Sequence, residues 1–463
     1  GKGNNGGDGF VVARLLKKKR IPCEVVLLAR REELTADAAH NLRAWSKLKG
    51  KVTELDGSKL QLLSQSFARH GLLVDAILGT GLKNAVAGLF GEAITLMNAS
   101  GLPTIAVDIP SGMDSDTGQQ LGAAIQAEMT VALGYPKLGE VIHPGLTHVG
   151  ELVVADIGID SRALAEVAPQ IELLDRETVR WLVPRRQSVT HKGTYGHLLV
   201  VAGARGKTGA AILACRAAMR TGAGLVTLAA PRALNGIFAG ALVEVMTEPL
   251  GDETCEQLEI FSDADWRRLI ERKNVLLFGP GIGVSDATQS ATRWLLRNVA
   301  MPWVIDADGL NNLTLDLDRL RRAQTAPILT PHPGEMVRLI GKSTADVNAD
   351  RIEVARGFAT AHRCHVVLKG ARTVIATADG KVFVNPTGNP GMASGGMGDV
   401  LAGIIAAFLG QGLSAEEAMK LGVYLHGYVG DRAAEAKGPI GLIASDIVDG
   451  LPKALAELSA SAS

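Results

Sequence analysis

The segment of residues 388–399 carries the strongest chemical signal in this sequence. It reads GNPGMASGGMGD, with five glycines in twelve residues, and the mostly apolar residues 400–409 follow directly. Glycine lets the backbone approach a ligand closely, and a helix that begins here points unpaired N–H groups and its positive dipole end back at the glycines. The pattern therefore predicts an anion site, with phosphate as the expected ligand. Asp399 stands where its carboxylate could take a proton from a hydroxyl group beside that phosphate.

A simpler interpretation of this segment is a glycine-rich surface loop in which Asp399 is an ordinary residue of a first helical turn. Further motifs in the same half of the chain weigh against it, because each stands at the expected end of a strand, where parallel sheets form a ligand crevice. These motifs are HKGTYG (191–196), GKTGAA (206–211), GPGIG (279–283), DADGLN (306–311), TPHPGE (330–335) and KGART (369–373). Taken singly, His332 could be a loop histidine and Lys369 a solvated lysine. The GKT triplet is not a phosphate-binding P-loop, because the GxxxxGK[ST] spacing is absent.

A second set of polar residues lies near the start of the chain. The run GKGNNGGDG (1–9) precedes a helical pattern that begins at Phe10, and the N–H groups of such a turn can hold a phosphate or a carbonyl. Asp75 and Asp108 stand at the ends of two expected strands, and Ser111 follows the second. Strand ends of one sense converge, so we expect Asn5, Asp75, Asp108 and Ser111 to meet, and oxygen ligands suit a hard cation. The alternative is that the two aspartates only cap neighbouring loops.

Composition limits the class of protein. The 463 residues are 47% hydrophobic and 21% charged, which indicates two or three folded domains with large cores. Lys+Arg and Asp+Glu number 48 each and only 4% of residues are aromatic, so neither nucleic acid nor an anionic membrane surface is an expected partner. No apolar run reaches membrane-spanning length. The four cysteines are far apart and form no CxxC pair, which favours a cytoplasmic location and neither a zinc site nor disulfides.

Strand and helix patterns alternate along the chain, which predicts an α/β protein with parallel sheets. Residues 160–176 lack a strand pattern, so we expect a first domain over 1–162, a linker over 163–178 and a second domain over 179–463. The expected strands of the first domain cover residues 25–29, 72–78, 104–109, 129–133 and 152–157, with helical patterns over 10–19, 35–49 and 89–98. Those of the second domain cover residues 197–202, 225–229, 275–278, 303–305, 328–330, 366–369 and 373–376.

The first domain resembles the NAD(P)H-hydrate epimerase domain in three motifs, GNNGGDG (3–9), VDAILGTG (74–81) and VDIPSG (107–112), which occur in that family's order. The resemblance implies a Rossmann-like domain that interconverts the two epimers of hydrated NADH or NADPH at carbon six of the nicotinamide ring. In the family, a strand and helices precede the glycine motif, and Pro usually stands at the position of Lys2. This chain starts at Gly1 within the motif, so we expect its first domain to lack its natural start.

The resemblance also implies roles for individual residues of the first domain. Asp108 would be the acid/base at the reacting carbon, and Lys137 would line the same pocket. Potassium would be bound by Asn5, Asp75 and Ser111. The hydrate would be contacted by Asn4, Asn5, Gly6, Gly7, Asp8, Gly79, Thr80, Gly81, Leu82, Lys83, Asn84, Ala85 and Asp108.

Residues 180–455 resemble the ADP-dependent NAD(P)H-hydrate dehydratase domain, which has the ribokinase-like α/β/α fold, in NPGMASGGMGD, TPHPGE and HKGTYG. The two domains in this order are similar to the family of bacterial bifunctional NAD(P)H-hydrate repair enzymes. The resemblance implies that ADP binds to Lys369, Gly370, Ala371, Arg372, Thr373 and Gly398. It implies that the hydrate contacts Ala211 (or its neighbour Ala210), Gly283, His332 and Asp399, with Asp399 as the catalytic base. Mg²⁺ is expected on the phosphates, with Asp306 and Glu335 near its water shell, and self-association is common among enzymes of this kind.

An alternative is a ribokinase-like kinase that phosphorylates a hydroxymethyl heterocycle and stops there, preceded by a non-catalytic nucleotide-binding module. The GxGD sequence ending at Asp399 is shared by both interpretations. The pair HPGE and KGTYG favours the dehydratase. A product assay separates the two, since a kinase leaves a stable phosphorylated product and a dehydratase releases phosphate and reduced cofactor.

Overall fold

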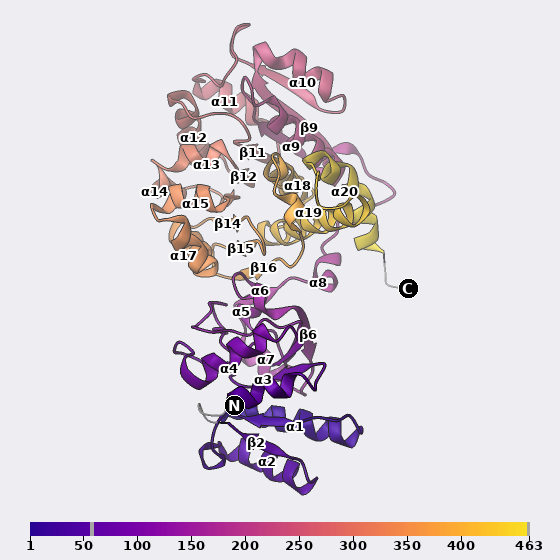
Figure 1. Cartoon of the computed structure of the whole chain (residues 1–463). Coiled ribbons are helices and arrows are strands. Elements are labelled where there is room, and N and C mark those ends of the chain that lie inside the picture. Colours follow the sequence, from indigo (N-terminus) through magenta and orange to yellow (C-terminus); the bar gives the residue numbers. More distant parts are fainter. Residues whose placement is uncertain (56–59, 461–463) are drawn as a thin grey trace. The chain divides into compact units, whose positions relative to one another are not determined.

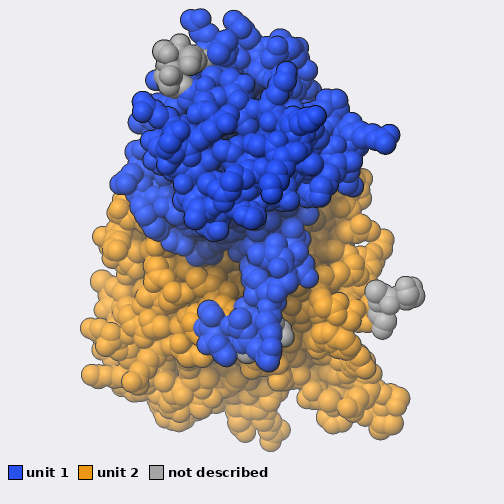
Figure 2. Space-filling view, turned by 90° about the horizontal axis from the view of Figure 1, so that it is seen from below, with its two compact units in different colours: residues 1–168 blue, residues 169–463 orange. Residues whose placement is uncertain are grey.

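The computed structural model describes residues 1–55 and 60–460. The chain divides into two compact units, Gly1–Ala168 and Pro169–Ser463, which are coloured blue and orange in Figure 2. Both units are built on mainly parallel sheets, so the predicted two-domain α/β fold is confirmed. The expected linker, residues 163–178, spans the junction between the units.

Unit 1 contains two parallel sheets, β1-β2 and β3-β4-β5-β6. The strands are β1 (Val25–Leu27), β2 (Val52–Glu54), β3 (Leu73–Asp75), β4 (Thr104–Val107), β5 (Met129–Leu133) and β6 (Glu151–Ala155). The helices are α1 (Asn4–Lys18), the 3₁₀ turn η1 (Arg31–Glu33), α2 (Ala36–Lys47), α3 (Gln61–Phe67), α4 (Gly88–Ala99), α5 (Leu138–Val141), α6 (Leu146–Val149) and α7 (Ser161–Val167). Sequence analysis missed β2, because its three residues give too short a pattern to separate a strand from a loop.

The core of unit 1 falls into separate apolar clusters. One packs α4 through Ile94 and Met97, and another packs α1 against α2 through Phe10 and Trp45. A cavity of about 400 Å³ is lined by residues of α1, β1, β3 and α4. In the described part of the chain β1 pairs only with β2, and β3 only with β4.

The glycine motif at the start of the chain forms part of α1, which begins at Asn4 and not at Phe10 as predicted. The glycines allow this helix to pack closely. A Cβ atom at Gly6 would lie 2.0 Å from the carbonyl oxygen of Gly1, and one at Gly9 would lie 2.8 Å from the Cβ of Ala76. The glycine motif therefore forms the first turns of α1, and not the turn before the helix that the sequence predicts.

Unit 2 is built on one ten-stranded sheet, ordered β10-β9-β8-β11-β12-β13-β14-β15-β16-β7. Among the described strands of this sheet, only the β14/β15 and β15/β16 pairs are antiparallel. The strands are β7 (Ile171–Leu173), β8 (His197–Val201), β9 (Leu225–Pro231), β10 (Met246–Leu250), β11 (Val275–Phe278), β12 (Trp303–Ile305), β13 (Ile328–Leu329), β14 (His365–Leu368), β15 (Val374–Ala376) and β16 (Val382–Val384).

Helices cover both faces of this sheet, which gives the predicted α/β/α layers (Figure 1). The helices α18, α19 and α20 lie to one side with α9, and α12, α13, α14, α15 and α17 lie to the other. The bounds are α8 (Arg176–Arg180), α9 (Thr208–Thr221), α10 (Asn235–Ala241), α11 (Asp263–Ile270), α12 (Asp286–Asn298), α13 (Asp308–Leu313), α14 (Leu317–Leu320), α15 (Pro333–Ile340), α16 (Thr344–Ala349), α17 (Arg351–His362), α18 (Met397–Gly410), α19 (Ala415–Lys437) and α20 (Ala444–Ser459). The 3₁₀ turns are η3 (Lys192–Tyr195), η4 (Arg232–Leu234) and η5 (Pro390–Met392).

The expectation that residues 160–176 contain no strand is wrong. Strand β7 lies in this stretch and pairs in parallel with β16, with Ile171 opposite Val382. The pattern Ile171-Glu172-Leu173 alternates only once, and Glu172 reaches Lys420 of α19 at 3.8 Å. These three residues at the edge of the sheet form a strand because they pair with β16, and their own sequence does not predict it.

Helix α18 is the central packing element of unit 2. Every residue from Val400 to Leu409 is buried, and a Cβ at Gly403 would lie 2.3 Å from the carbonyl oxygen of Ala214 in α9. This close approach fixes the start of α18, where Asp399 lies, against the rest of the unit. Despite its apolar character, neither α18 nor any other helix of the described residues combines the length and the hydropathy that crossing a membrane requires.

Candidate functional site

The start of α18 has the geometry that the glycine-rich segment predicts. Gly396 precedes the helix with a φ of +87°, a conformation that favours glycine, and Asp399 is the third residue of the helix. The N–H groups of this first turn have no partner within the helix and point back at the loop. A Cβ at Gly398 would lie 3.0 Å from the Nζ of Lys369, so glycine here leaves room for the lysine.

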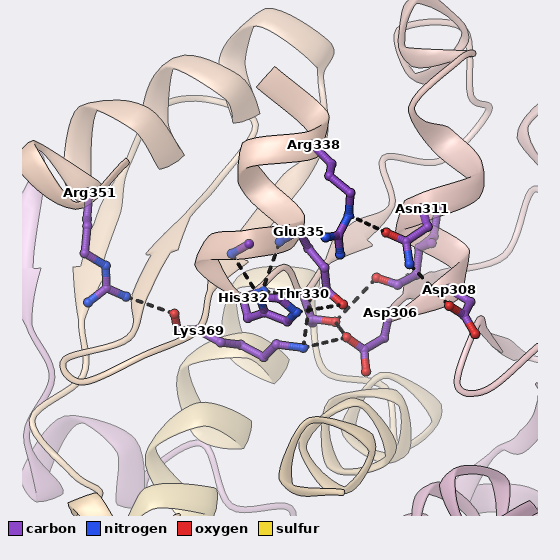
Figure 3. A network of polar contacts seen from close by, with 11 residues as sticks. Asp306, Asp308, Asn311, Thr330, His332, Glu335, Arg338, Arg351 and Lys369 are labelled. Atoms are coloured by element: carbon purple, nitrogen blue, oxygen red, sulfur yellow. Dashed lines mark hydrogen bonds and ion pairs between the residues drawn. The ribbon is translucent and has the colours of Figure 1, made fainter. Parts of the chain in front are cut away.

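Lys369 sits among carboxylates at the carboxyl ends of the central strands (Figure 3). Its Nζ lies 2.8 Å from Oδ1 of Asp306 and 3.7 Å from Oε2 of Glu335, while Thr330 donates a 2.7 Å hydrogen bond to the same Asp306 oxygen. Burial alone would lower the pKa of Lys369, but the carboxylates of Asp306, Glu335 and Asp399 raise it, so the side chain is an ammonium ion. The alternative of a solvated lysine is therefore wrong.

The carboxyl group of Asp399 is tuned for proton transfer near neutral pH. Burial is the main cause that raises its pKa to about 7, and the negative charge of Asp306 adds to it, whereas Lys369 opposes the rise. A base works best when its pKa is close to the working pH. Asp399 therefore combines the position and the basicity that removal of a proton from a hydroxyl group requires.

His332 is held at the N-terminus of α15. Its Nδ1 accepts hydrogen bonds from the N–H groups of Gly334 and Glu335 at 3.0 and 3.3 Å, and Oε2 of Glu335 accepts from the His332 N–H at 2.8 Å. Burial lowers the pKa of His332, so the ring is neutral, and its occupied Nδ1 leaves the proton on Nε2. The ring is thus a helix cap whose Nε2–H lies 3.5 Å from Oε1 of Glu335, which refines the loop-histidine interpretation.

Two of the predicted loops are tied together by Asp308. Its Oδ2 accepts hydrogen bonds from Lys207 Nζ at 2.8 Å and from the N–H of Gly283 at 2.9 Å. Burial alone would raise the pKa of Asp308, but these hydrogen bonds lower it, so the carboxylate stays charged. The side chain of Ala211 is fully buried in the core, whereas its neighbour Ala210 is partly exposed.

In unit 1, the structure brings Asn5, Asp75 and Ser111 together as predicted. Ser111 donates to the fully buried Asp75 through Oγ at 2.6 Å and through its N–H at 2.7 Å. Asn5 donates through Nδ2 to the carbonyl of Leu78 at 2.8 Å, while its buried Oδ1 has no hydrogen-bond partner. Asp75 also accepts the Ile77 N–H at 3.1 Å, so its contacts agree with the loop-capping alternative, while the free Asn5 oxygen leaves an acceptor open to a donor or a cation.

Asp108 lies at the end of β4 with a φ of +70°, a strained value for a residue other than glycine. Its carboxylate contacts Lys137 Nζ and accepts a 3.2 Å hydrogen bond from the N–H of Leu133. Burial, and then the negative charge of Asp108, raise the pKa of Asp8. The structure thus pairs Asp108 with Lys137.

The loop of residues 79–85 approaches this region at Gly79. Gly79 approaches Asn5 closely, since a Cβ at Gly79 would lie 3.2 Å from the Cβ of Asn5. Further along, Lys83 is exposed and lies 3.6 Å from Asp116. On the other side, Thr35 donates a 3.1 Å hydrogen bond to Oδ1 of Asn4.

Comparison with known proteins identifies both units. The family described as NAD(P)H-hydrate dehydratase matches residues 198–453, and the family described as YjeF-related protein N-terminus matches residues 1–139. The bifunctional NAD(P)H-hydrate repair enzyme of Moorella thermoacetica is 46% identical over 99% of this chain and 87% of its own length. The Escherichia coli enzyme of the same name is 37% identical over 98% of this chain and 83% of its own. This chain belongs to the bifunctional NAD(P)H-hydrate repair enzyme family.

Unit 2 of this repair-enzyme family member is similar to solved structures. The ADP/ATP-dependent NAD(P)H-hydrate dehydratase of Bacillus subtilis, co-crystallised with ATP and Mg²⁺, is 30% identical with a TM-score of 0.54, and the match covers 62% of this chain and 98% of that one. A ribokinase-like protein of Enterococcus faecalis is 26% identical with a TM-score of 0.54, over 63% of this chain and 97% of its own. The repair-enzyme interpretation is therefore favoured over the kinase alternative.

Two residues of this repair-enzyme chain escaped sequence analysis. Glu140 is fully buried beside Lys137, accepts the Lys137 N–H at 2.6 Å, and leaves Oε1 without a partner. Burial raises its pKa to about 7. Arg351 contacts the backbone of the KGART loop. Neither stands in a glycine-rich motif or at a strand end, so the sequence carried no signal for them.

Proposed function

We propose that this chain repairs hydrated NADH and NADPH in two steps. Unit 1 interconverts the R and S hydrates at nicotinamide carbon six, and unit 2 uses ADP to dehydrate the S hydrate to NAD(P)H, with release of AMP and phosphate. Membership of the repair-enzyme family supports this proposal. The observation that carries it is Asp399, whose pKa is raised to about 7, at the N-terminus of α18 beside Lys369.

Dehydration needs help because hydroxide is a poor leaving group. In the proposed reaction Asp399 removes the proton from the hydroxyl on carbon six, and the oxygen attacks the terminal phosphorus of ADP as the bond to AMP breaks. The N–H groups at the start of α18 stabilise the charge on the transferring phosphoryl group. The new phosphate ester then leaves as phosphate, assisted by the ring nitrogen. Loss of a proton from the neighbouring ring carbon restores NAD(P)H.

For the nucleotide, we propose that ADP lies against Lys369, Gly370, Ala371, Arg372, Thr373 and Gly398. The hydrate then contacts Gly283, His332, Asp399 and the α9 start, where Ala210 is the more accessible of the two alanines. Lys369 supplies the fixed positive charge on the ADP side.

The side chains beside Lys369 offer Mg²⁺ two carboxylates, those of Asp306 and Glu335. Among the described residues no cluster of three His, Cys, Asp or Glu side chains could hold a metal. Mg²⁺ commonly takes one or two carboxylates and fills its shell with phosphate oxygens and water. Asp306 and Glu335 supply that number of carboxylates, so they would hold the ion through its water shell, where it would neutralise phosphate charge.

In unit 1, we propose Asp108 as the acid/base for epimerisation, oriented by Lys137. The hydrate would lie between residues 4–8 and residues 79–85. K⁺ fits the site formed by Asn5, Asp75 and Ser111, because the orphaned Asn5 Oδ1, a buried carboxylate and a hydroxyl oxygen are hard ligands. The ion would hold the Asn5 side chain and neutralise Asp75. We also propose a cytoplasmic, homo-oligomeric enzyme.

The test uses a mixture of both hydrate epimers with the chain, ADP, Mg²⁺ and K⁺, and follows reduced-nicotinamide absorbance and free phosphate. Full conversion faster than spontaneous epimerisation is the expected result. Rapid recovery of about half the absorbance followed by a slow tail would mean that unit 1 does not epimerise. Absence of recovery with either ADP or ATP, together with a stable phosphorylated product, would contradict the dehydratase proposal in favour of a kinase.

A further inference from the structure

Arg351 donates hydrogen bonds to the backbone of the KGART loop and of the strand before it. It is the first residue of α17, which packs against β14 and β15, and its side chain reaches the end of β14 (Figure 3). The guanidinium donates to three main-chain carbonyls: Leu368 at 3.0 Å, Lys369 at 3.1 Å and Ala371 at 2.5 Å. The carbonyls of Lys369 and Ala371 belong to the loop where the proposed function places ADP, and Leu368 is the last residue of β14.

The arrangement is costly to fold, because a partly buried positive charge has no opposite charge beside it. Burial lowers the pKa of Arg351 to about 10, and its Nε has no hydrogen-bond partner. Within the described residues, no carboxylate lies within ion-pair distance of Arg351. Only carbonyl dipoles compensate the charge of the guanidinium, so its position adds little to the stability of the fold. We therefore look for a role of Arg351 other than stabilisation.

The planarity of the peptide bond determines how these hydrogen bonds orient the N–H groups of the loop. The C=O and N–H groups of one planar trans peptide point in opposite directions. Carbonyls of Lys369 and Ala371 that turn toward Arg351 therefore turn the N–H groups of Gly370 and Arg372 away from it. In the part of the chain that the structure describes, neither N–H donates to a protein acceptor, whereas the Lys369 N–H donates to Pro331 O at 2.8 Å. Two oriented donors are thus left for a ligand.

Gly370 is shaped for the same contact. Its φ of +143° is open to glycine and strained for other residues, and a Cβ there would lie 2.9 Å from Nη2 of Arg351. A side chain at this position would displace the guanidinium or the loop. The glycine and the arginine are therefore parts of one arrangement.

We infer that Arg351 is a positioning residue for the nucleotide: it fixes the KGART loop so that the N–H groups of Gly370 and Arg372 face acceptor atoms of a bound nucleoside diphosphate. This inference rests on the proposed ADP site. Arg351 touches neither the hydrate nor the reacting phosphoryl group in this scheme. Its loss should weaken ADP binding and leave the chemical step at saturating ADP largely intact.

The test compares Arg351→Met and Arg351→Lys in the full chain, with Arg356→Met as the matched control. Arg356 lies on the same helix and forms its ion pair with Glu353 at 2.6 Å. Calorimetry gives Kd for ADP, and dehydration kinetics give KM for ADP and kcat. For Arg351→Met we expect Kd and KM to rise about tenfold or more, as when several oriented hydrogen bonds are lost, with kcat within about threefold.

Arg351→Lys should lie between the wild type and Arg351→Met, since lysine keeps the charge but cannot fork onto three carbonyls. It carries the test if Arg351→Met does not fold. Gly370→Ala should also weaken ADP binding. The Kd for ADP of the double variant Arg351→Met/Gly370→Ala should be no higher than that of the single variant that binds ADP more weakly, because both changes disrupt the same arrangement.

Unchanged Kd for ADP in Arg351→Met or Arg351→Lys would overturn the inference, as would an equal loss in Arg356→Met. A fall in kcat with KM unchanged would overturn it too, because it would assign Arg351 to the chemistry. If the wild-type chain itself bound no ADP, the proposed function would fail first.

Discussion

The Nζ of Lys369 lies 2.8 Å from Oδ1 of Asp306, and this single ammonium neutralises a group of carboxylates. Glu335 lies 3.7 Å from the same Nζ, and Asp399 adds its charge from the start of α18. Asp306 is almost fully buried, so its charge cannot be screened by water. The acid/base behaviour of Asp399 and the stability of unit 2 therefore both depend on Lys369.

Lys369→Met should destabilise unit 2 by about 3–5 kcal/mol at pH 7, because it leaves buried carboxylates without a partner. Urea unfolding measures this loss. Lys207→Met is the matched control, since the Lys207 side chain that pairs with Asp308 is half exposed and its loss should cost about 0–1 kcal/mol. Equal costs for both variants would show that Lys369 has no special electrostatic role.

Asp399→Asn should reduce the rate of dehydration by about 10²–10⁴-fold, the usual contribution of a general base, while the Kd for ADP changes little. In the wild type, kcat should fall as the pH drops below about 7, because protonation of Asp399 removes the base. Stopped assays across pH 5–9 and calorimetry with ADP check both parts. Asp286→Asn, an exposed position in the first turn of α12, should match the wild type. Retained turnover in Asp399→Asn would remove Asp399 as the base.

The same raised pKa gives Asp399 a cost in stability. A carboxyl group whose pKa rises on folding disfavours the folded state once the pH exceeds its unfolded value, and the full cost is reached above the folded value of about 7. Asp399→Asn should therefore raise Tm by a few degrees at pH 8 and by less at pH 5. Thermal unfolding at the two pH values measures the difference. A gain independent of pH would mean that folding does not raise the pKa of Asp399.

Much of this site follows from the sequence, because strand ends are easy to locate. Asp306, His332, Lys369 and Asp399 each directly follow a buried strand or open a helix, and the parallel sheet gathers them. The fold class followed from the alternation of strand and helix patterns. Edge strands such as β7 and the start of α1 did not, since tertiary packing determines them.

Other features could not be found without coordinates. Arg351 and Glu140 act through backbone groups and burial, which leave no motif in the sequence. The helical role of Gly6, Gly7 and Gly9 also escaped, because glycine is permissive and its function depends on the neighbouring element it meets. Helix packing and a phosphate turn require the same residue type at these positions.

Potassium should stabilise unit 1 through Asn5, Asp75 and Ser111. We expect Tm to rise with KCl relative to tetramethylammonium chloride at equal ionic strength, and epimer exchange to accelerate. Ser111→Ala should abolish both responses, because it removes one ligand and the 2.6 Å bond that orients Asp75. Ser46→Ala, on the exposed face of α2, is the control. Identical responses to both salts in the wild type would contradict a cation at this site.

Asp108→Asn should abolish epimer exchange and leave dehydration of the S hydrate unchanged. Asparagine tolerates the positive φ of this position and keeps the size of the side chain, so the change removes the charge and the proton-carrying group without repacking. Lys137 would lose its anionic partner, and the variant should therefore be less stable than the wild type. Exchange is followed by the proton signal at nicotinamide carbon six, and dehydration by phosphate release from the purified S hydrate. Exchange at the wild-type rate would exclude Asp108 as the acid/base, whereas loss of both activities would point to a folding defect that circular dichroism would reveal.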